Sequence, residues 1–219
     1  MEAAGRIGWE PAPEQGWVAP HLTEEFPGLG IAWVTLDCKA TRRSPEPVRR
    51  RLRDLSDRFY GSHAIHLRER PVPWAYRVFF RQIGLDPDRT RTPVEQLALD
   101  RLREGAFKST GIPQDALDIA VVETGVALRA FDAERLDGPL CIHDSGPGEA
   151  IVEGGEELPQ GTLVVADRRG PVMPLFGGEG AAPVTAETRR VTVAAVQVKG
   201  VPQISVDEAL WMSAAALES

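Results

Sequence analysis

The 219-residue sequence has only two cysteines, Cys38 and Cys141, which lie far apart and form no CxxC pair. This spacing excludes paired-cysteine redox and metal motifs, and we expect two free thiols in the core rather than a disulfide. No apolar run approaches the roughly 18 residues of a membrane span, and the N-terminus lacks a signal-peptide pattern. We therefore expect a cytoplasmic protein with no membrane partner.

Standard catalytic motifs are also missing. The sequence has no GxSxG elbow, no Walker GxxxxGK[ST] and no GxGxxG between a strand and a helix. These absences disfavour a serine hydrolase and a nucleotide-cofactor enzyme, and we expect no cofactor. His63 and His66 lie three residues apart, but no nearby Cys, Asp or further His completes a tetrahedral set, so we expect no metal.

The net charge of −7 argues against a nucleic-acid-binding protein, and we expect no DNA partner, but the charge is unevenly distributed. Residues 39–108 contain 17 Lys and Arg against 9 Asp and Glu, whereas both flanking parts of the chain are acidic. Two interpretations follow. The arginines form either a local phosphate-contacting layer or an ordinary solvated helix surface.

Apolar spacing and terminal residues predict helices at residues 47–61, 74–83, 93–104 and 115–123. Thr92, Pro93 and Glu95 supply the N-cap, first-turn proline and capping-box acid of the third helix. Ser205, followed by Glu208, predicts a capping box at the start of a C-terminal helix. Short apolar segments between Gly, Pro and acidic turns predict strands at 126–131, 140–143, 162–166, 172–176 and 191–198.

These elements predict an α+β fold. Residues 45–124 form a helical layer that packs on a mostly antiparallel sheet or barrel-like element made by the rest of the chain. Residues 1–20, rich in proline and glycine without apolar periodicity, are expected to be an irregular arm. Residues 21–219 are expected to form a single domain.

The segment from Gly170 to Arg190, GPVMPLFGGEGAAPVTAETRR, contains four glycines around one acid, Glu179. Glycine allows positive φ and a close approach of the backbone to a ligand, so this segment has the character of a pocket wall. The alternative is that Glu179 lies in a solvated turn.

Four other stretches extend this pattern in order along the chain: FPGLGIAWVTL (26–36), WAYRVFFRQIGLDP (74–87), GVALRAFDAERLDG (125–138) and TLVVAD (162–167). Together with the glycine-rich segment they resemble the B3/B4 domain of the phenylalanyl-tRNA synthetase beta subunit and its free-standing relatives. The likeness runs from about Phe26 to Val201. It implies a B3/B4-like fold, which is a firmer expectation than any shared function.

The resemblance implies a site that binds the 3′ end of a misacylated tRNA and hydrolyses the ester, chiefly removing tyrosine. The acid that reads the tyrosine hydroxyl falls on Glu179, with Gly177 and Gly178 before it. The family's histidine falls on Arg129, and its threonine on Leu117. Arginine is always charged and cannot act as a neutral acceptor, although it can hold a phosphate or a carboxylate.

Two further positions belong to the same stretch. Asp115 retains the family's aspartate, and Asp118 replaces its asparagine. On the second helix, Arg77 and Arg81 are candidate RNA contacts, the alternative being solvated or ion-paired side chains.

The leading hypothesis is a free-standing aminoacyl-tRNA deacylase that acts in trans. In it, Glu179, Gly177 and Gly178 select the acyl group, and Arg129 positions the terminal adenosine or a phosphate. The hypothesis names no catalytic side chain, because an activated ester, a positioned water and backbone donors suffice for hydrolysis. The alternative is a non-catalytic RNA- or small-ligand-binding module, favoured by the changes at Leu117 and Arg129.

Overall fold

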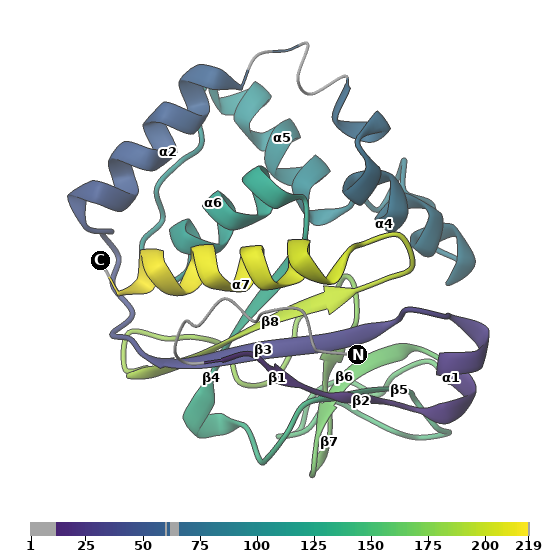
Figure 1. The fold of residues 1–219 in the computed structure, drawn as a ribbon. Helices are drawn as coiled ribbons and strands as arrows, with labels where there is room; N and C mark the ends of the chain where they lie inside the picture. The colour runs from purple at the N-terminus through teal and green to yellow at the C-terminus, as the bar shows by residue number, and fades with distance from the viewer. Residues whose placement is uncertain (1–11, 60, 62–65, 219) are drawn as a thin grey trace, which may run out of the picture.

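The computed structural model describes residues 12–59, 61 and 66–218. Within them, two four-stranded sheets are covered on one side by five α-helices, whereas the short helix α1 (Pro20–Glu25) lies beside the second sheet (Figure 1). The α+β prediction is therefore confirmed. None of the helices in the described part of the chain combines the length and apolar composition needed to cross a membrane.

The first sheet has the order β1 (Glu14–Gln15), β3 (Gly30–Asp37), β8 (Arg190–Gln197) and β4 (Ala127–Asp132), with all neighbours antiparallel. The second has the order β2 (Trp17–Val18), β5 (Cys141–Asp144), β6 (Leu163–Asp167) and β7 (Gly170–Pro174). Only β2 and β5 are parallel there. The mostly antiparallel pairing agrees with the sequence. The barrel-like alternative was wrong, because the sheets remain separate and open within the described residues.

The N-terminal segment is more ordered than the sequence suggests. Residues 14–18 pair with both sheets, and the chain passes from one sheet to the other at Gly16. A Cβ at Gly16 would lie 2.4 Å from the carbonyl oxygen of Leu140 and 2.5 Å from Cγ2 of Ile31. Only glycine fits this crossing. The chain then enters α1 (Pro20–Glu25), which the sequence did not predict; residues 1–11 lie outside the described residues.

The outer helices follow their local signals closely. They are α2 (Glu46–Arg58), α4 (Pro71–Gln82) and α5 (Pro93–Glu104). A short 3₁₀ turn, Leu67–Glu69, precedes α4. The predicted capping box of Thr92 and Glu95 is present at the start of α5.

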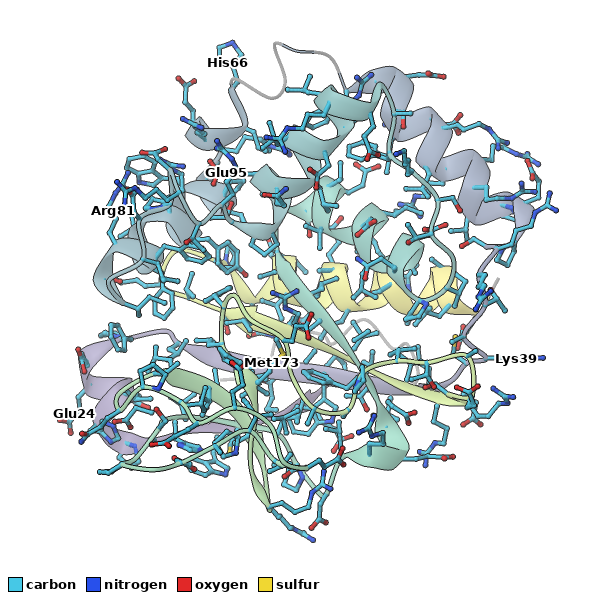
Figure 2. The ribbon with its side chains drawn as sticks, turned by 180° about the vertical axis from the view of Figure 1, so that it is seen from behind. Glu24, Lys39, His66, Arg81, Glu95 and Met173 are labelled. Carbon is cyan, nitrogen blue, oxygen red and sulfur yellow. The ribbon has the colours of Figure 1, made fainter. Side chains whose placement is uncertain are left out.

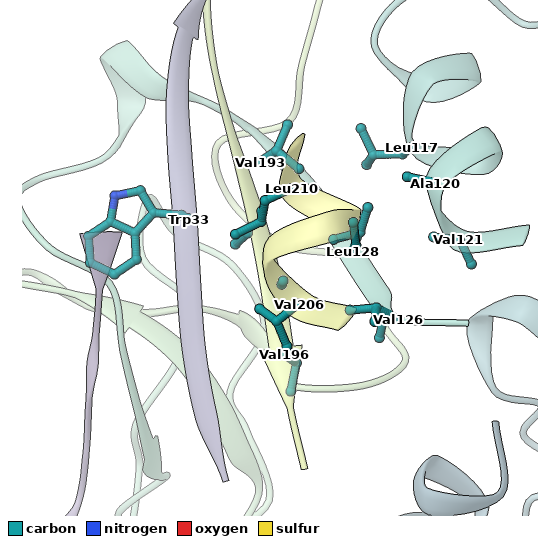
Figure 3. Packing of buried hydrophobic residues seen from close by; sticks show 14 of the residues in the cluster. Trp33, Leu117, Ala120, Val121, Val126, Leu128, Val193, Val196, Val206 and Leu210 are labelled. Carbon is teal, nitrogen blue, oxygen red and sulfur yellow. The ribbon is translucent and has the colours of Figure 1, made fainter. Parts of the chain in front are cut away.

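Two inner helices connect this layer to the first sheet. α6 (Gln114–Thr124) contacts α2, α5 and α7, and ends at Gly125 as predicted. α7 (Gln203–Leu217) lies on β3 and β8, where Val206 and Leu210 pack near Leu128 and Val193 (Figure 3). The predicted capping box at Ser205 was wrong. The helix begins at Gln203 after Pro202, so Ser205 already lies within its first turn.

The sequence expectation about the two cysteines is confirmed. Cys38 and Cys141 are free and buried, and burial raises the pKa of both thiols. Phe79 and Phe80 are 3% and 1% exposed. These phenylalanines therefore serve packing rather than base stacking.

Candidate functional site

The glycine-rich segment after β7 is anchored at both ends. At its start, the Leu175 amide donates to the carbonyl of Leu163 at 2.7 Å, and Phe176 packs against Phe80 with ring centroids 4.7 Å apart. At its end, the Ala181 amide donates to the carbonyl of Val172 at 2.8 Å. The four residues between these anchors, 177–180, are exposed.

The exposed part of the segment has an unusual backbone. Gly177 and Gly178 have φ values of 77° and 68°, two successive left-handed residues that side chains other than hydrogen would strain. Neither their amides nor that of Glu179 donates to any described residue. The Glu179 carboxylate likewise has no ion pair within the described residues. The segment thus offers several donors and one acid to solvent.

This segment runs alongside β4. Phe176 packs against Tyr76, whose hydroxyl accepts a hydrogen bond from the Ala127 amide at the start of β4. Ala182 accepts a hydrogen bond from the Asp132 amide at the end of β4, at 2.9 Å. The segment therefore spans the length of β4. The described contacts include none between Glu179 and Arg129, so the proximity of these two residues is part of the function proposed below.

Arg129 is a cation without a partner. Its side chain is half-buried, and it makes no hydrogen bond or ion pair with any described residue. Arg129 pairs with Ala194 on the adjacent strand β8, and Ala194 offers only a methyl group. Ala194 in turn pairs with Trp33 on β3. Burial lowers the pKa of Arg129 with no acid to oppose it, yet a guanidinium remains charged at neutral pH. Such a desolvated cation is a candidate anion-binding group.

Asp115 has a structural role. It is fully buried, and its carboxylate accepts hydrogen bonds at 2.5–3.1 Å from Ser44, Ser109, Thr110 and Gly111. These bonds hold the segments that lead into α2 and α6. The structure therefore does not present Asp115 to a ligand, although the sequence placed it among the substrate-binding residues.

Leu117 differs from the sequence expectation in the same way. It is 3% exposed and belongs to the main hydrophobic core beneath α7 (Figure 3). Its apolar side chain stabilises α6 against that core rather than lining an open surface. Our proposal below therefore depends on Glu179, Gly177, Gly178 and Arg129.

Asp118, which stands where the family has an asparagine, is a titrating group to which the sequence assigned no role. It is 9% exposed on α6, and Gln114 donates to its carboxylate at 2.6 Å. Burial raises the pKa of Asp118 to about 6, although the hydrogen bond from Gln114 opposes the rise. Its signal in the sequence was an acid within the otherwise apolar stretch from Ala116 to Val122.

The two candidate RNA-contacting arginines have different surroundings. Arg77 is 4% exposed and is bonded to Glu95 at 2.7 Å and to Asp88 at 2.8 Å. Burial acts to lower the pKa of Arg77, but these acids outweigh it and raise the pKa. Arg77 therefore joins α4 to α5. Of the two sequence interpretations, its side chain fits the ion-paired one and not the RNA contact. Arg81 is exposed on α4 (Figure 2), with its guanidinium 5.8 Å from the ring centroid of Trp74.

The predicted absence of a metal site involved a histidine pair that the structure describes only in part. His63 lies outside the described residues. His66 is exposed and its Nδ1 lies 3.1 Å from the carboxylate of Glu69.

The fold is thus an α+β domain with an exposed, glycine-bordered acid, Glu179, and with an arginine, Arg129, that has no ion pair among the described residues. The family model described as the B3/4 domain matches residues 75–205, so the chain belongs to this family.

Its relatives include beta subunits of phenylalanine–tRNA ligase. The chain is 31% identical to that of Tropheryma whipplei over 140 residues, which cover 62% of this chain and 14% of the relative. It is 36% identical to that of Methylococcus capsulatus over 87 residues, covering 38% and 11%. The chain thus spans a small part of these relatives. A solved N-terminal fragment of the phenylalanyl-tRNA synthetase beta subunit from Pyrococcus horikoshii aligns with 94% of this chain and 52% of its own, at 15% identity and a TM-score of 0.41.

Proposed function

We propose that this protein binds the aminoacylated 3′ end of tRNA and hydrolyses the ester of a mischarged amino acid in trans. The proposal is supported by the unpaired, half-buried Arg129 on β4 and by an exposed segment with free backbone donors and a free carboxylate, which continues into Ala182 at the end of β4. The similarity to subunits whose name includes phenylalanine–tRNA ligase supports a tRNA as the partner. Such a substrate places the reaction in the cytoplasm.

The reaction needs little from side chains. Water attacks the ester carbonyl, and the amides of Gly177 and Gly178 donate to the oxyanion that develops on the carbonyl oxygen. The bond to the ribose oxygen then breaks, and this oxygen takes up the proton lost by the attacking water. The products are the free amino acid and the uncharged tRNA. Hydrolysis of this kind requires no cofactor, because positioning and backbone electrostatics lower the barrier.

Binding and selection are assigned to charged groups. Arg129 binds a phosphate or the terminal nucleotide, since an anion relieves the cost of its desolvated charge. Glu179 accepts a hydrogen bond from a polar group on the acyl moiety, such as a hydroxyl or the ammonium. Arg81 and the neighbouring Trp74, which is 49% exposed, offer a cation and an aromatic surface to the RNA strand.

A deacylation screen with a panel of mischarged tRNAs tests this proposal. We expect wild type to hydrolyse at least one member, and Glu179→Ala and Arg129→Ala each to slow that reaction by about 10²-fold or more. Glu156→Ala and Arg103→Ala remove exposed groups of the same charge on other surfaces and should leave the rate unchanged. If the two control variants lost as much deacylation rate as Glu179→Ala and Arg129→Ala, the proposed site would be refuted.

The screen also distinguishes the alternative, a non-catalytic RNA-binding module. In that case wild type hydrolyses no member of the panel, yet binds tRNA with an affinity that falls steeply with salt. The buried Leu117, which offers no hydroxyl, is the observation that favours this second function. A chain that neither hydrolyses nor binds tRNA would refute both.

A further inference from the structure

A cavity of about 510 Å³ adjoins the start of the glycine-rich segment, where Leu175 and Phe176 line it. It is formed where α1, the C-terminal end of α4 and the turn between β5 and β6 meet. None of Glu179, Gly177, Gly178 and Arg129 lines it. Cavities of this volume are typical of small-molecule sites.

The floor of the cavity is apolar and aromatic. Leu22 and Leu175, which are 2% and 1% exposed, lie beneath it together with Phe26 and Phe176. Both phenylalanines pack edge-on against Phe79, with centroid distances of 5.4 and 6.0 Å. This packing fixes both rings, so the floor can accept an apolar body without rearranging.

The rim carries negative charge. Glu25 and Asp144 are both at the cavity, and no Lys or Arg is among the described residues that line it. Asp144 is bonded to Nε2 of His21 at 2.7 Å, whereas Glu25 has no ion pair with any described residue. Gln82 and Gln160 add amide groups.

The backbone adds to this charge. α4 ends at Gln82, and both Gln82 and Ile83 line the cavity. The C-terminal end of a helix carries a partial negative charge and favours cations. Aromatic rings beside carboxylates are likewise suited to an organic cation, because the ring faces attract positive charge.

We propose that this cavity binds a small organic cation, an ammonium group that carries an aromatic or branched apolar body. The ammonium lies at the rim against Glu25 and Asp144, and the apolar body lies on the floor between Phe26 and Phe176. This site is separate from the tRNA-end site proposed above, and its test does not depend on that function.

Three probes that share a phenyl ring and differ in charge test the inference by NMR titration of the isotope-labelled chain. They are 2-phenylethylamine, the neutral 2-phenylethanol and the anionic 3-phenylpropionate. We expect the amine to bind with a Kd on the order of 1 mM, given its size, and to shift the amide signals of Gly161 and Thr162, which line the cavity. The alcohol should bind several-fold more weakly, and the acid should not bind. Equal binding of the acid, or no shifts with the amine at about ten times that concentration, would overturn the proposal.

A matched pair of variants on α1 locates the charge. Glu25→Gln should weaken amine binding about 5- to 10-fold, whereas Glu24→Gln, on the same helix and outside the cavity, should leave it within about 2-fold. Both are surface substitutions and should fold. Glu179→Ala should bind the amine as wild type does, so this result is independent of any deacylase activity. Equal effects of the substitutions at Glu24 and Glu25 would contradict the proposed site.

Discussion

Asp118 makes the stability of this protein depend on pH in a direction that can be calculated. Its folded-state pKa is about 6 against an ordinary value of 3.8, because burial in α6 disfavours the charged carboxylate. The rise is about two pKa units, and each unit corresponds to about 1.4 kcal/mol, so ionisation costs the folded state about 3 kcal/mol. Because the folded-state pKa is raised, the contribution of neutral Asp118 to folding stability is fully present below about pH 4 and is lost as pH rises through about 6.

Asp118→Asn removes this titration while retaining an acceptor for Gln114. We expect the difference in unfolding free energy, variant minus wild type, to increase by about 3 kcal/mol from below pH 4 to above pH 6 and to stay level at higher pH. Urea denaturation at a series of pH values, followed by circular dichroism, measures this difference. Gln114→Ala should move the inflection to higher pH in wild type and should have no pH-dependent effect in Asp118→Asn. A difference that is constant from pH 3.5 to 8 would refute the assignment.

Three further substitutions separate structural from binding arginines. Arg129→Met should raise stability by on the order of 1 kcal/mol in thermal unfolding, because it removes an unpaired desolvated charge. The same variant should bind tRNA ends more weakly. A destabilised variant would show that Arg129 is a structural residue. Arg77→Ala should lower stability by about 1.5–3 kcal/mol in urea titrations, because it removes a charged hydrogen bond from the buried Glu95, which keeps only Arg68, at 3.3 Å, as a cation. Arg81→Ala should leave stability within about 0.5 kcal/mol but reduce the salt slope of tRNA binding by about 1; an unchanged slope would exclude Arg81 from the RNA surface.

The parts of the fold that follow from local chemistry could be predicted from the sequence. The start of α5 is an example, since Thr92, Pro93 and Glu95 determine it within one helical turn. The two-residue strands β1 and β2 could not be predicted, because pairing with distant strands rather than local propensity stabilises them. Whether the strands close into a barrel depends on similar long-range contacts.

The candidate site shows the same division. Gly177 and Gly178 marked a segment with special backbone, and both adopt positive φ. The sequence could not show that Asp115 would be saturated by four distant or neighbouring donors, since Ser44 lies 71 residues away. Nor could it show that Arg77 would meet Glu95 across a helix boundary. Burial and partner choice are tertiary properties, so residue type alone left both alternatives open.

Helix α4 connects the two surfaces that the proposed function requires. Its inner side carries Tyr76, whose hydroxyl donates to the carbonyl of Val196 on β8 and whose ring packs against Phe176, at the start of the glycine-rich segment. Its outer side carries Arg81 and Trp74. An RNA strand held on the outer side would therefore be fixed relative to Glu179 through one helix and one aromatic contact. Because a rigid element sets that spacing, loss of the Tyr76 contacts should impair positioning of the RNA end more than its attraction to the surface.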